Sequence, residues 1–269
     1  MHNERVSQDA IDAAIQSYYR DAFDEGARLT TRSMQGRLEF ERTQEIVRAS
    51  TPAPARVLDV GGATGVHSAS LAAVGYDVVL VEPVESQVQV AQEIGTFDAL
   101  VGDARDLPFE ADSFDAVLIA GPLYHLAGRN DRLQALREAV RVCRTGGFVH
   151  AAAIPRFLAF AVAALNRDVL EQAAGEWISL LREGVPPKTV RFPAGHFHTP
   201  EELEEEMTSA GLRAVTVVGL EGPAALGLET ASDLTESDYD AATHLARTFA
   251  TSTMLRNFSC HLLGTGQVG

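Results

Sequence analysis

The sequence predicts an α/β protein whose doubly wound sheet of seven strands carries N-terminal helices and a helical lid insertion. Two observations support this fold class. Strand patterns and helix patterns alternate from residue 56 onward, which is typical of a parallel sheet with helices on both faces. The first strand also runs directly into a glycine-rich turn at 61–65, and ligands of such folds bind at the carboxyl ends of the strands.

The seven strands are expected in order along the chain. Five apolar runs form the first part of the sheet, at 56–60, 77–82, 98–101, 115–120 and 147–153. Two more runs follow after a long interval, at 213–219 and 258–264. Two helices, 7–19 and 36–49, precede the sheet, and residues 1–50 would form a helical cover.

A long insertion, 154–199, separates the fifth strand from the sixth. It carries helical stretches at about 157–170 and 172–182. Insertions of this size in compact domains tend to be functional lids. We therefore expect one core, formed by 51–153 and 200–269, with the lid inserted in the same domain.

Composition narrows the classes of partner. The chain has 269 residues, and its formal net charge of −15 would repel a phosphate backbone. The longest apolar run, 157–165, is too short to span a bilayer, and the first ten residues lack an apolar signal segment. Cys143 on an expected helix and Cys260 on an expected strand indicate reduced core residues. We expect a cytoplasmic protein, monomeric or homodimeric, without nucleic-acid or membrane partners.

The spacing of the glycines indicates which ligand the turn accepts. A dinucleotide site needs G-x-G-x-x-G, but the frame from Gly61 meets Ala63 and Val66 instead of glycines. The frame from Gly62 fails in the same way. A nicotinamide-dependent oxidoreductase is therefore disfavoured. Glu82 ends the second strand, where an acidic residue commonly holds the hydroxyl groups of a ribose.

Four motifs in order resemble the class I S-adenosylmethionine-dependent methyltransferases. Asp59, Gly61, Ala63 and Gly65 follow the D-x-G-x-G-x-G turn of that family with one substitution. Further matches are the strand and acid at 99–104, the loop and strand at 112–120, and the helix, Gly-Gly turn and strand at 136–149. The resemblance implies a Rossmann-like sheet of strand order 3-2-1-4-5-7-6 with an antiparallel last strand. Because Ala63 replaces the usual middle glycine, its position should avoid a positive φ.

The resemblance also implies a set of cofactor contacts. The turn would cradle the methionine part of S-adenosylmethionine, Glu82 the ribose and Asp103 the adenine amino group, with S-adenosylhomocysteine as the product. Tyr18 and Tyr19 on the first helix face different directions, so at most one should close over the sulfonium. Arg42 is a candidate for gripping a carboxylate, with a solvated helix face as the alternative. The expected cofactor residues are Tyr18, Tyr19, Arg42, Asp59, Gly61, Gly62, Ala63, Gly65, Glu82, Pro83, Gly102, Asp103, Ala104, Ala120 and Gly121.

The segment after the fourth strand, 121–126 (GPLYHL), borders the methyl group in this family. It differs from the Asn/Asp-Pro-Pro-Tyr signature of relatives that methylate amides, and it resembles a bacterial subgroup of small-molecule methyltransferases. Tyr124 and His125 are therefore candidates for contacting the acceptor. His125 could act as a general base, since an ordinary histidine exchanges protons near neutral pH, or it could cap a helix.

A second histidine pair closes the lid insertion. His196 and His198 should point the same way if their segment is extended. They are candidate bases, with a surface position as the alternative; a metal site is not expected, because no third ligand lies nearby in sequence. Phe192 and Trp177 are candidates for an aromatic wall of the acceptor site, or for packing that buries the insertion.

These residues predict an enzyme that transfers a methyl group to an oxygen or nitrogen of a small metabolite. Such a transfer is an in-line displacement, so holding the two reactants in line supplies much of the acceleration. An alternative from another class is an idle relative that binds the cofactor and regulates or scaffolds a partner.

Overall fold

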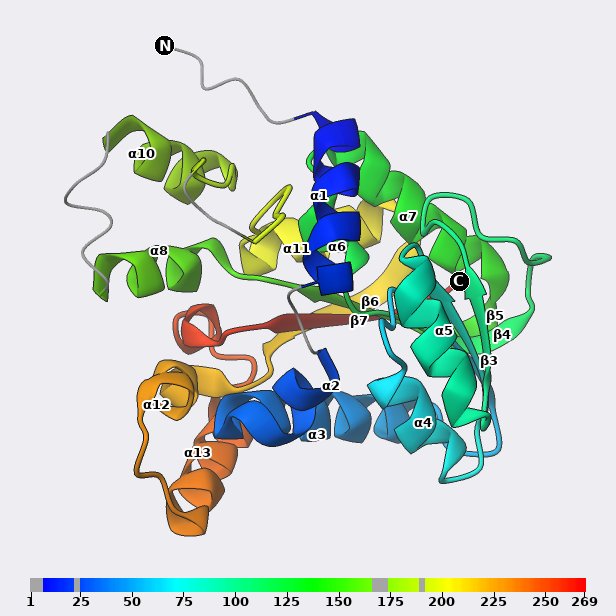
Figure 1. Ribbon diagram of the computed structural model, residues 1–269, viewed down its shortest axis with the longest axis horizontal. Coiled ribbons are helices and arrows are strands. Elements are labelled where there is room, and N and C mark those ends of the chain that lie inside the picture. Colours follow the sequence, from blue (N-terminus) through cyan, green and yellow to red (C-terminus); the bar gives the residue numbers. More distant parts are fainter. Residues whose placement is uncertain (1–6, 22–24, 166–173, 189–191) are drawn as a thin grey trace.

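The computed structural model describes residues 7–21, 25–165, 174–188 and 192–269. Its centre is a seven-stranded sheet of order β3-β2-β1-β4-β5-β7-β6, which confirms the expected order (Figure 1). β7 runs antiparallel to both β5 and β6, and the other neighbouring pairs are parallel. The strands are β1 Arg56–Val60, β2 Asp77–Glu82, β3 Asp98–Val101, β4 Phe114–Ile119, β5 Cys143–Ala153, β6 Leu212–Gly219 and β7 Leu262–Val268.

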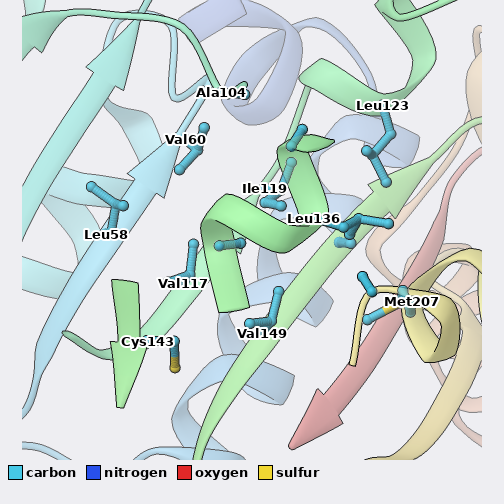
Figure 2. Packing of buried hydrophobic residues seen from close by; sticks show 14 of the residues in the cluster. Leu58, Val60, Ala104, Val117, Ile119, Leu123, Leu136, Cys143, Val149 and Met207 are labelled. Atoms are coloured by element: carbon cyan, nitrogen blue, oxygen red, sulfur yellow. The ribbon is translucent and has the colours of Figure 1, made fainter. Parts of the chain in front are cut away.

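Helices cover both faces of the sheet because successive side chains of each strand point to opposite sides. Leu58 and Val117 belong to a core shared with α7 (Arg129–Val142) and α11 (Pro200–Ser209). Figure 2 shows this packing, with Leu136 and Met207 reaching toward the strands. The opposite core, which includes Val57 and Ala116, is closed by α3 (Met34–Ser50) and α4 (Val66–Ala72).

The first N-terminal helix lies beside the carboxyl end of β2, and its role as a cover stays a prediction. α1 (Gln8–Asp21) contacts α5 (Glu85–Ile94), and the side chain of Gln16 donates a hydrogen bond to Pro83 O at 2.9 Å. A short helix, α2 (Glu25–Ala27), leads into a π-helical turn, Arg28–Arg32. α3 then begins at Met34, two residues before the expected start, because Ser33 Oγ accepts from Gly36 N and caps the helix.

The insertion between β5 and β6 contains α8 (Arg156–Leu165) and α10 (Ala174–Glu183), which pack against each other. Figure 1 shows both helices at one side of the molecule. The expected continuation of this helical pair through 166–173 lies outside the described residues. α11 follows with a capping box, in which Thr199 and Glu202 satisfy each other's backbone N–H groups.

The segment between β6 and β7 builds a second helical layer against α3. It holds two short 3-10 turns, Gly222–Ala224 and Leu255–Phe258, on either side of α12 (Ala225–Thr230) and α13 (Glu236–Phe249). Leu228 and Tyr239 pack with Leu38 of α3. A short four-residue helix, α6 (Pro122–His125), directly follows β4.

Two strand predictions were displaced. β7 was expected at 258–264 but runs over Leu262–Val268, because 255–258 form a 3-10 turn. Glycine has a low strand propensity, so its presence in 262–268 made this segment a weak strand candidate. Tertiary packing nevertheless requires a glycine at 264, because a Cβ there would collide with Met207. β5 begins at Cys143, which therefore starts a strand and does not end a helix. Cys260 precedes β7, and both thiols are free, as expected.

Within the described ranges, no helix combines the length and the apolar character that crossing a membrane requires.

Candidate functional site

A cavity of about 310 Å³ opens at the carboxyl ends of β1, β2 and β4. Its volume is at the lower end of the range of ~300 to 1,000 Å³ that is typical of small-molecule sites. It brings together most of the residues that the sequence assigned to the cofactor and the acceptor. The predicted residues that line it are Tyr19, Gly61, Gly62, Ala63, Glu82, Pro83, Gly102, Asp103, Ala104, Ala120, Gly121, Tyr124 and His125.

The turn after β1 forms one wall of the cavity, and close packing explains its glycines. Gly61 has a φ of +74°, and a Cβ there would lie 2.6 Å from Pro122 Cδ. Gly65 has a φ of +85° and would meet the ring of Phe97. Gly65 shapes the turn but does not line the cavity.

Ala63 corrects one expectation. Its φ is +49°, in the left-handed region that its position was expected to avoid. A residue with a Cβ is strained there by about 1 kcal/mol. The conformation is retained because it aims the Ala63 N–H at Glu82 Oε2, 3.2 Å away. The turn therefore stores a small strain beside the ligand site.

Asp59 lies beneath the turn and does not line the cavity, contrary to its expected contact with the cofactor. Its carboxylate is fully buried and accepts a hydrogen bond from Ser68 Oγ at 2.7 Å. A Cβ on Gly62 would lie 2.7 Å from this carboxylate, so the turn can pack directly against Asp59 only because residue 62 is a glycine. Burial raises the pKa of Asp59 to about 6. Asp59 therefore supports the turn from below.

The two acidic residues expected at the nucleoside do line the cavity. Glu82 also accepts from the N–H of Val84 at 3.0 Å, which fixes its carboxylate at the end of β2. Asp103 is paired with Arg105, whose guanidinium lies 2.5 Å from Asp103 Oδ2 and 3.3 Å from Asp12 on α1. Burial opposes ionisation of Asp103, but Arg105 outweighs burial and lowers the pKa of this carboxyl. A purine amino group at Asp103 would share the carboxylate with Arg105.

Both ring nitrogens of His125 are engaged. Nδ1 lies 2.8 Å from Pro193 O, which can only accept, so Nδ1 carries the proton and Nε2 faces the Tyr19 hydroxyl at 3.2 Å. Burial lowers the pKa of His125 to about 4. The residue lines the cavity as expected, and this geometry fits a positioning role; the expected role of base stays a prediction.

An aromatic cluster packs around His125. The ring of Phe192 lies 5.1 Å from that of His125 and 5.8 Å from that of Tyr124. Tyr18 packs edge to face on Phe192 at 5.9 Å. Tyr19 lines the cavity, whereas Tyr18 and Phe192 do not. The rings of Tyr18 and Tyr19 nevertheless contact each other edge to face at 5.1 Å, so the two residues belong to one cluster.

Neither His196 nor His198 lines the cavity. Their rings are stacked edge to face at 4.6 Å and both face α11, as an extended segment predicts. We call their surroundings the lid network: His196, His198, Arg132, Arg156, Glu202 and Glu206. Burial lowers the pKa of His196 to about 4 and lowers that of His198 as well. The expected catalytic role of this pair is corrected to fastening the lid segment onto the core.

Two other candidates also lie away from the cavity. Trp177 is buried among Leu180 and Phe197, so it packs the insertion and forms no acceptor wall. Arg42 is buried in α3 and pairs with Glu45 at 2.7 Å, which leaves it outside the cavity. In both cases the side chain contacts residues other than those of the cavity, and the sequence alone did not indicate these contacts.

The cavity also contains a polar group that sequence reasoning missed. Glu39 and His261 line it, and Arg28 lines it beside them. His261 Nδ1 lies 2.7 Å from Glu221 Oε1 and 3.1 Å from Glu39 Oε2. We call these four residues the cavity network. Arg28 and Glu39 lie more than 180 residues before Glu221 and His261 in the sequence, and no local motif marks the four residues.

Comparisons with known proteins agree with this geometry. A family model described as "Methyltransferase domain" matches residues 58–151. A demethylmenaquinone methyltransferase from Roseiflexus castenholzii is 32% identical over 205 residues, covering 69% of this chain and 79% of the relative. A ubiquinone biosynthesis O-methyltransferase from Azorhizobium caulinodans is 30% identical over 171 residues, covering 61% of each chain.

A solved structure supports the fold alone. It is a methyltransferase from Thermotoga maritima, described as a possible histamine N-methyltransferase, with 18% identity. The two structures superpose with a TM-score of 0.60 over 96% of this chain and 100% of that one.

Proposed function

Because this chain belongs to the class I S-adenosylmethionine-dependent methyltransferases, we propose that it methylates an oxygen or nitrogen of a small metabolite. One observation carries the proposal. The strained glycine turn, Glu82 and Asp103 line a single cavity that also reaches Tyr124 and His125. The residues that we propose for the nucleoside and for the acceptor therefore line the same cavity.

The residues present fit the cofactor. The turn 61–65 offers backbone without large side chains, and a Cβ on Gly61 or Gly102 would collide with its neighbours. Glu82 would hold the ribose hydroxyls, and the walls at Gly102, Asp103 and Ala104 would hold the purine. When bound, S-adenosylmethionine supplies a methyl group made electrophilic by a positive sulfur.

The protein's own groups would orient the acceptor and exclude water. Tyr19 on α1 lines the cavity and is hydrogen-bonded to His125, whose other nitrogen is bonded to Pro193 O. Tyr124 and Gly121 line the wall that follows β4. Holding the acceptor atom in line with the methyl carbon would supply much of the rate enhancement.

The relatives named for demethylmenaquinone and for ubiquinone biosynthesis support a small organic acceptor. The net charge of −15 supports a site without nucleic acid. We propose a cytoplasmic monomer or homodimer that acts without a membrane partner.

Calorimetric titration tests the cofactor site. S-adenosylhomocysteine should bind and NAD should not. Glu82→Ala should weaken binding of the thioether roughly tenfold to a hundredfold, since hydrogen bonds to a charged group contribute about 1.5 to 3 kcal/mol. Glu85→Ala is the matched control, because Glu85 is an exposed acid at the start of α5. Tight NAD binding without thioether binding would end the proposal.

A second experiment separates catalysis from binding alone. The protein is incubated with methyl-labelled S-adenosylmethionine and a metabolite extract, and the label is sought in small molecules. Transfer into a small product is expected. Repeated absence of transfer by folded, thioether-binding protein would contradict an active enzyme and favour a scaffold.

A further inference from the structure

The cavity network joins three parts of the chain at the wall of the cavity. Glu39 comes from α3, Glu221 follows β6, and His261 immediately precedes β7. His261 borders the same space as Leu118 and Ala120 of the β4 end. The same cavity reaches Tyr124, which we propose for the acceptor.

Hydrogen bonds fix the ring of His261. Glu221 Oε1 lies 2.7 Å from Nδ1, and Glu221 Oε2 accepts the His261 backbone N–H at 2.9 Å. Carboxylates can only accept, so the Nδ1 atom carries the proton. The neutral ring then has its lone pair on Nε2, for which the described part of the chain supplies no partner. Such a carboxylate–imidazole pair fixes both tautomer and orientation.

Both carboxylates are already saturated with donors. Glu221 is fully buried and also accepts from Gln35 Nε2 at 2.6 Å and from Ser259 Oγ at 2.5 Å. Glu39 accepts from two nitrogens of Arg28, at 2.5 and 2.9 Å. A metal ion would have to displace these donors. Nε2 of His261 is therefore the basic atom that the network offers to the cavity.

The charges around His261 favour protonation of that atom. Among the described residues, the charged groups paired with it or with its carboxylates are Glu39, Glu221 and the guanidinium of Arg28. The network has one negative charge in excess until His261 takes a proton. Burial alone would lower the pKa of His261, but the two carboxylates outweigh burial and raise it. The neighbouring Cys260 stays a neutral thiol, because burial raises its pKa.

The rest of the cavity indicates the chemical class of the acceptor. Leu29, Leu118, Ala152 and Leu220 give the walls an apolar character. Such walls suit the carbon skeleton of a hydroxyl compound whose hydroxyl group can form a hydrogen bond with Nε2. A hydroxyl group is also a weak nucleophile that gains most from an adjacent base.

We propose that His261 is the catalytic base for a hydroxyl acceptor, an alcohol or a phenol, held against its Nε2 atom. This inference rests on the methyl transfer proposed above. The hydroxyl proton moves to Nε2, and an oxygen lone pair forms the bond to the methyl carbon. The carbon–sulfur bond breaks and its electron pair remains on sulfur. Glu221 and Glu39 are positioning residues, and the imidazolium returns its proton to solvent.

The first test needs no acceptor. In the full chain with isotope-labelled histidine rings, nuclear magnetic resonance measures the chemical shift of each ring nitrogen as the pH is varied. The signals that disappear in His261→Asn are those of His261. The Nδ1-protonated tautomer is expected, with Nε2 as the titrating atom. Glu221→Gln should move this titration to lower pH, because it removes a negative charge. If Glu221→Gln does not fold, Glu39→Gln gives the same test. An Nε2-protonated ring, or a titration that does not move, overturns the proposal.

The second test measures methyl transfer to matched probes. Labelled S-adenosylmethionine is supplied with a naphthol and the corresponding naphthylamine, or with a cresol and the corresponding toluidine. Label should enter the hydroxyl probe of a pair. His261→Gln should lower that rate by a factor on the order of 10² or more, the scale of general-base catalysis. Glu39→Gln should shift the rising limb of the pH–rate profile to lower pH.

Controls separate this proposal from the proposed function. His261→Gln should bind S-adenosylhomocysteine as the parent protein does, and His244→Gln, an exposed histidine of α13, should change neither rate nor affinity. If label enters only the amine probes, or if His261→Gln transfers methyl groups at an undiminished rate, the assignment of His261 as the base is overturned. The proposed methyl transfer is unaffected by either result. If no probe is labelled, the ring titration decides the assignment. Failure to bind the thioether counts against the proposed function instead.

Discussion

The lid network and the cavity network contain the same kinds of side chain, but the pKa values of their histidines are shifted in opposite directions. In the lid network, burial lowers the pKa of His196 to about 4, even though Glu202 lies 3.2 Å away. In the cavity network, two carboxylates outweigh burial and raise the pKa of His261. A glutamate beside a histidine therefore does not by itself raise the pKa of the imidazole, because the other charged neighbours also contribute.

The balance of charges explains the difference. In the lid network, Arg132 and Arg156 match the two carboxylates of Glu202 and Glu206, so little negative potential remains for the histidines. In the cavity network a single guanidinium faces two carboxylates. The lid network also lies outside the cavity, whereas His261 borders it. We infer that the first network stabilises the fold and the second serves the chemistry.

The largest expected effect is on the lid network. Arg132 is buried, pairs with Glu206 at 2.7 Å and donates to the carbonyls of Leu126 and Ala127. Arg132→Leu should lower the free energy of unfolding by about 3 to 5 kcal/mol, because it leaves a buried carboxylate unpaired. Urea denaturation measures the loss. Arg129→Leu, at a half-exposed pair with Glu205, should cost less than about 1 kcal/mol. Equal losses in the two variants would contradict the comparison.

The next effect is on the dependence of stability on pH. His196 has a pKa of about 4 in the folded protein and an ordinary value near 6.5 when unfolded, so the unfolded chain binds the extra proton first. Its contribution is present above pH 6.5 and is lost as the pH falls toward 4. His196→Gln should reduce that loss by about 1 to 3 kcal/mol, measured by denaturation across this range.

His261 supplies the contrast within the same experiment. Its pKa is raised on folding, so its contribution is present below the unfolded value and is lost as the pH rises through the folded value. His261→Gln should therefore change the slope in the opposite direction from His196→Gln. Slopes that change in the same direction would break the distinction between the two networks.

The smallest expected effect is at the glycine turn, on the cavity side. If that side is built for a ligand at some cost in stability, relieving its strain should stabilise the protein. Ala63→Gly should raise the free energy of unfolding by roughly 0.5 to 1 kcal/mol, because glycine accepts the φ of +49°. Ala13→Gly, on an exposed position of α1, should lower it by about as much. Destabilisation by Ala63→Gly would show that the turn is not strained.

The sequence predicted the cavity-lining residues at the strand ends better than it predicted the surroundings of the histidines. Glu82 and Asp103 end their strands, so the edge of the sheet places them together. His125 was correctly placed on the cavity wall, but the neighbours that engage its two nitrogens, Tyr19 and Pro193, come from distant segments. His196 was predicted as a candidate base because it lies two residues before His198, but in the structure it faces α11. The network at His261 was missed altogether.

What the sequence determined by itself was the sheet and its ligand-binding edge. Strand periodicity, the turn 61–65 and the acids at strand ends are local features, and parallel strands bring their carboxyl ends to one place. What only the tertiary structure decided was the electrostatics of the histidines. The pKa of a buried imidazole depends on charges that the fold brings within a few ångströms, and those of His261 come from Arg28, Glu39 and Glu221, far away along the chain.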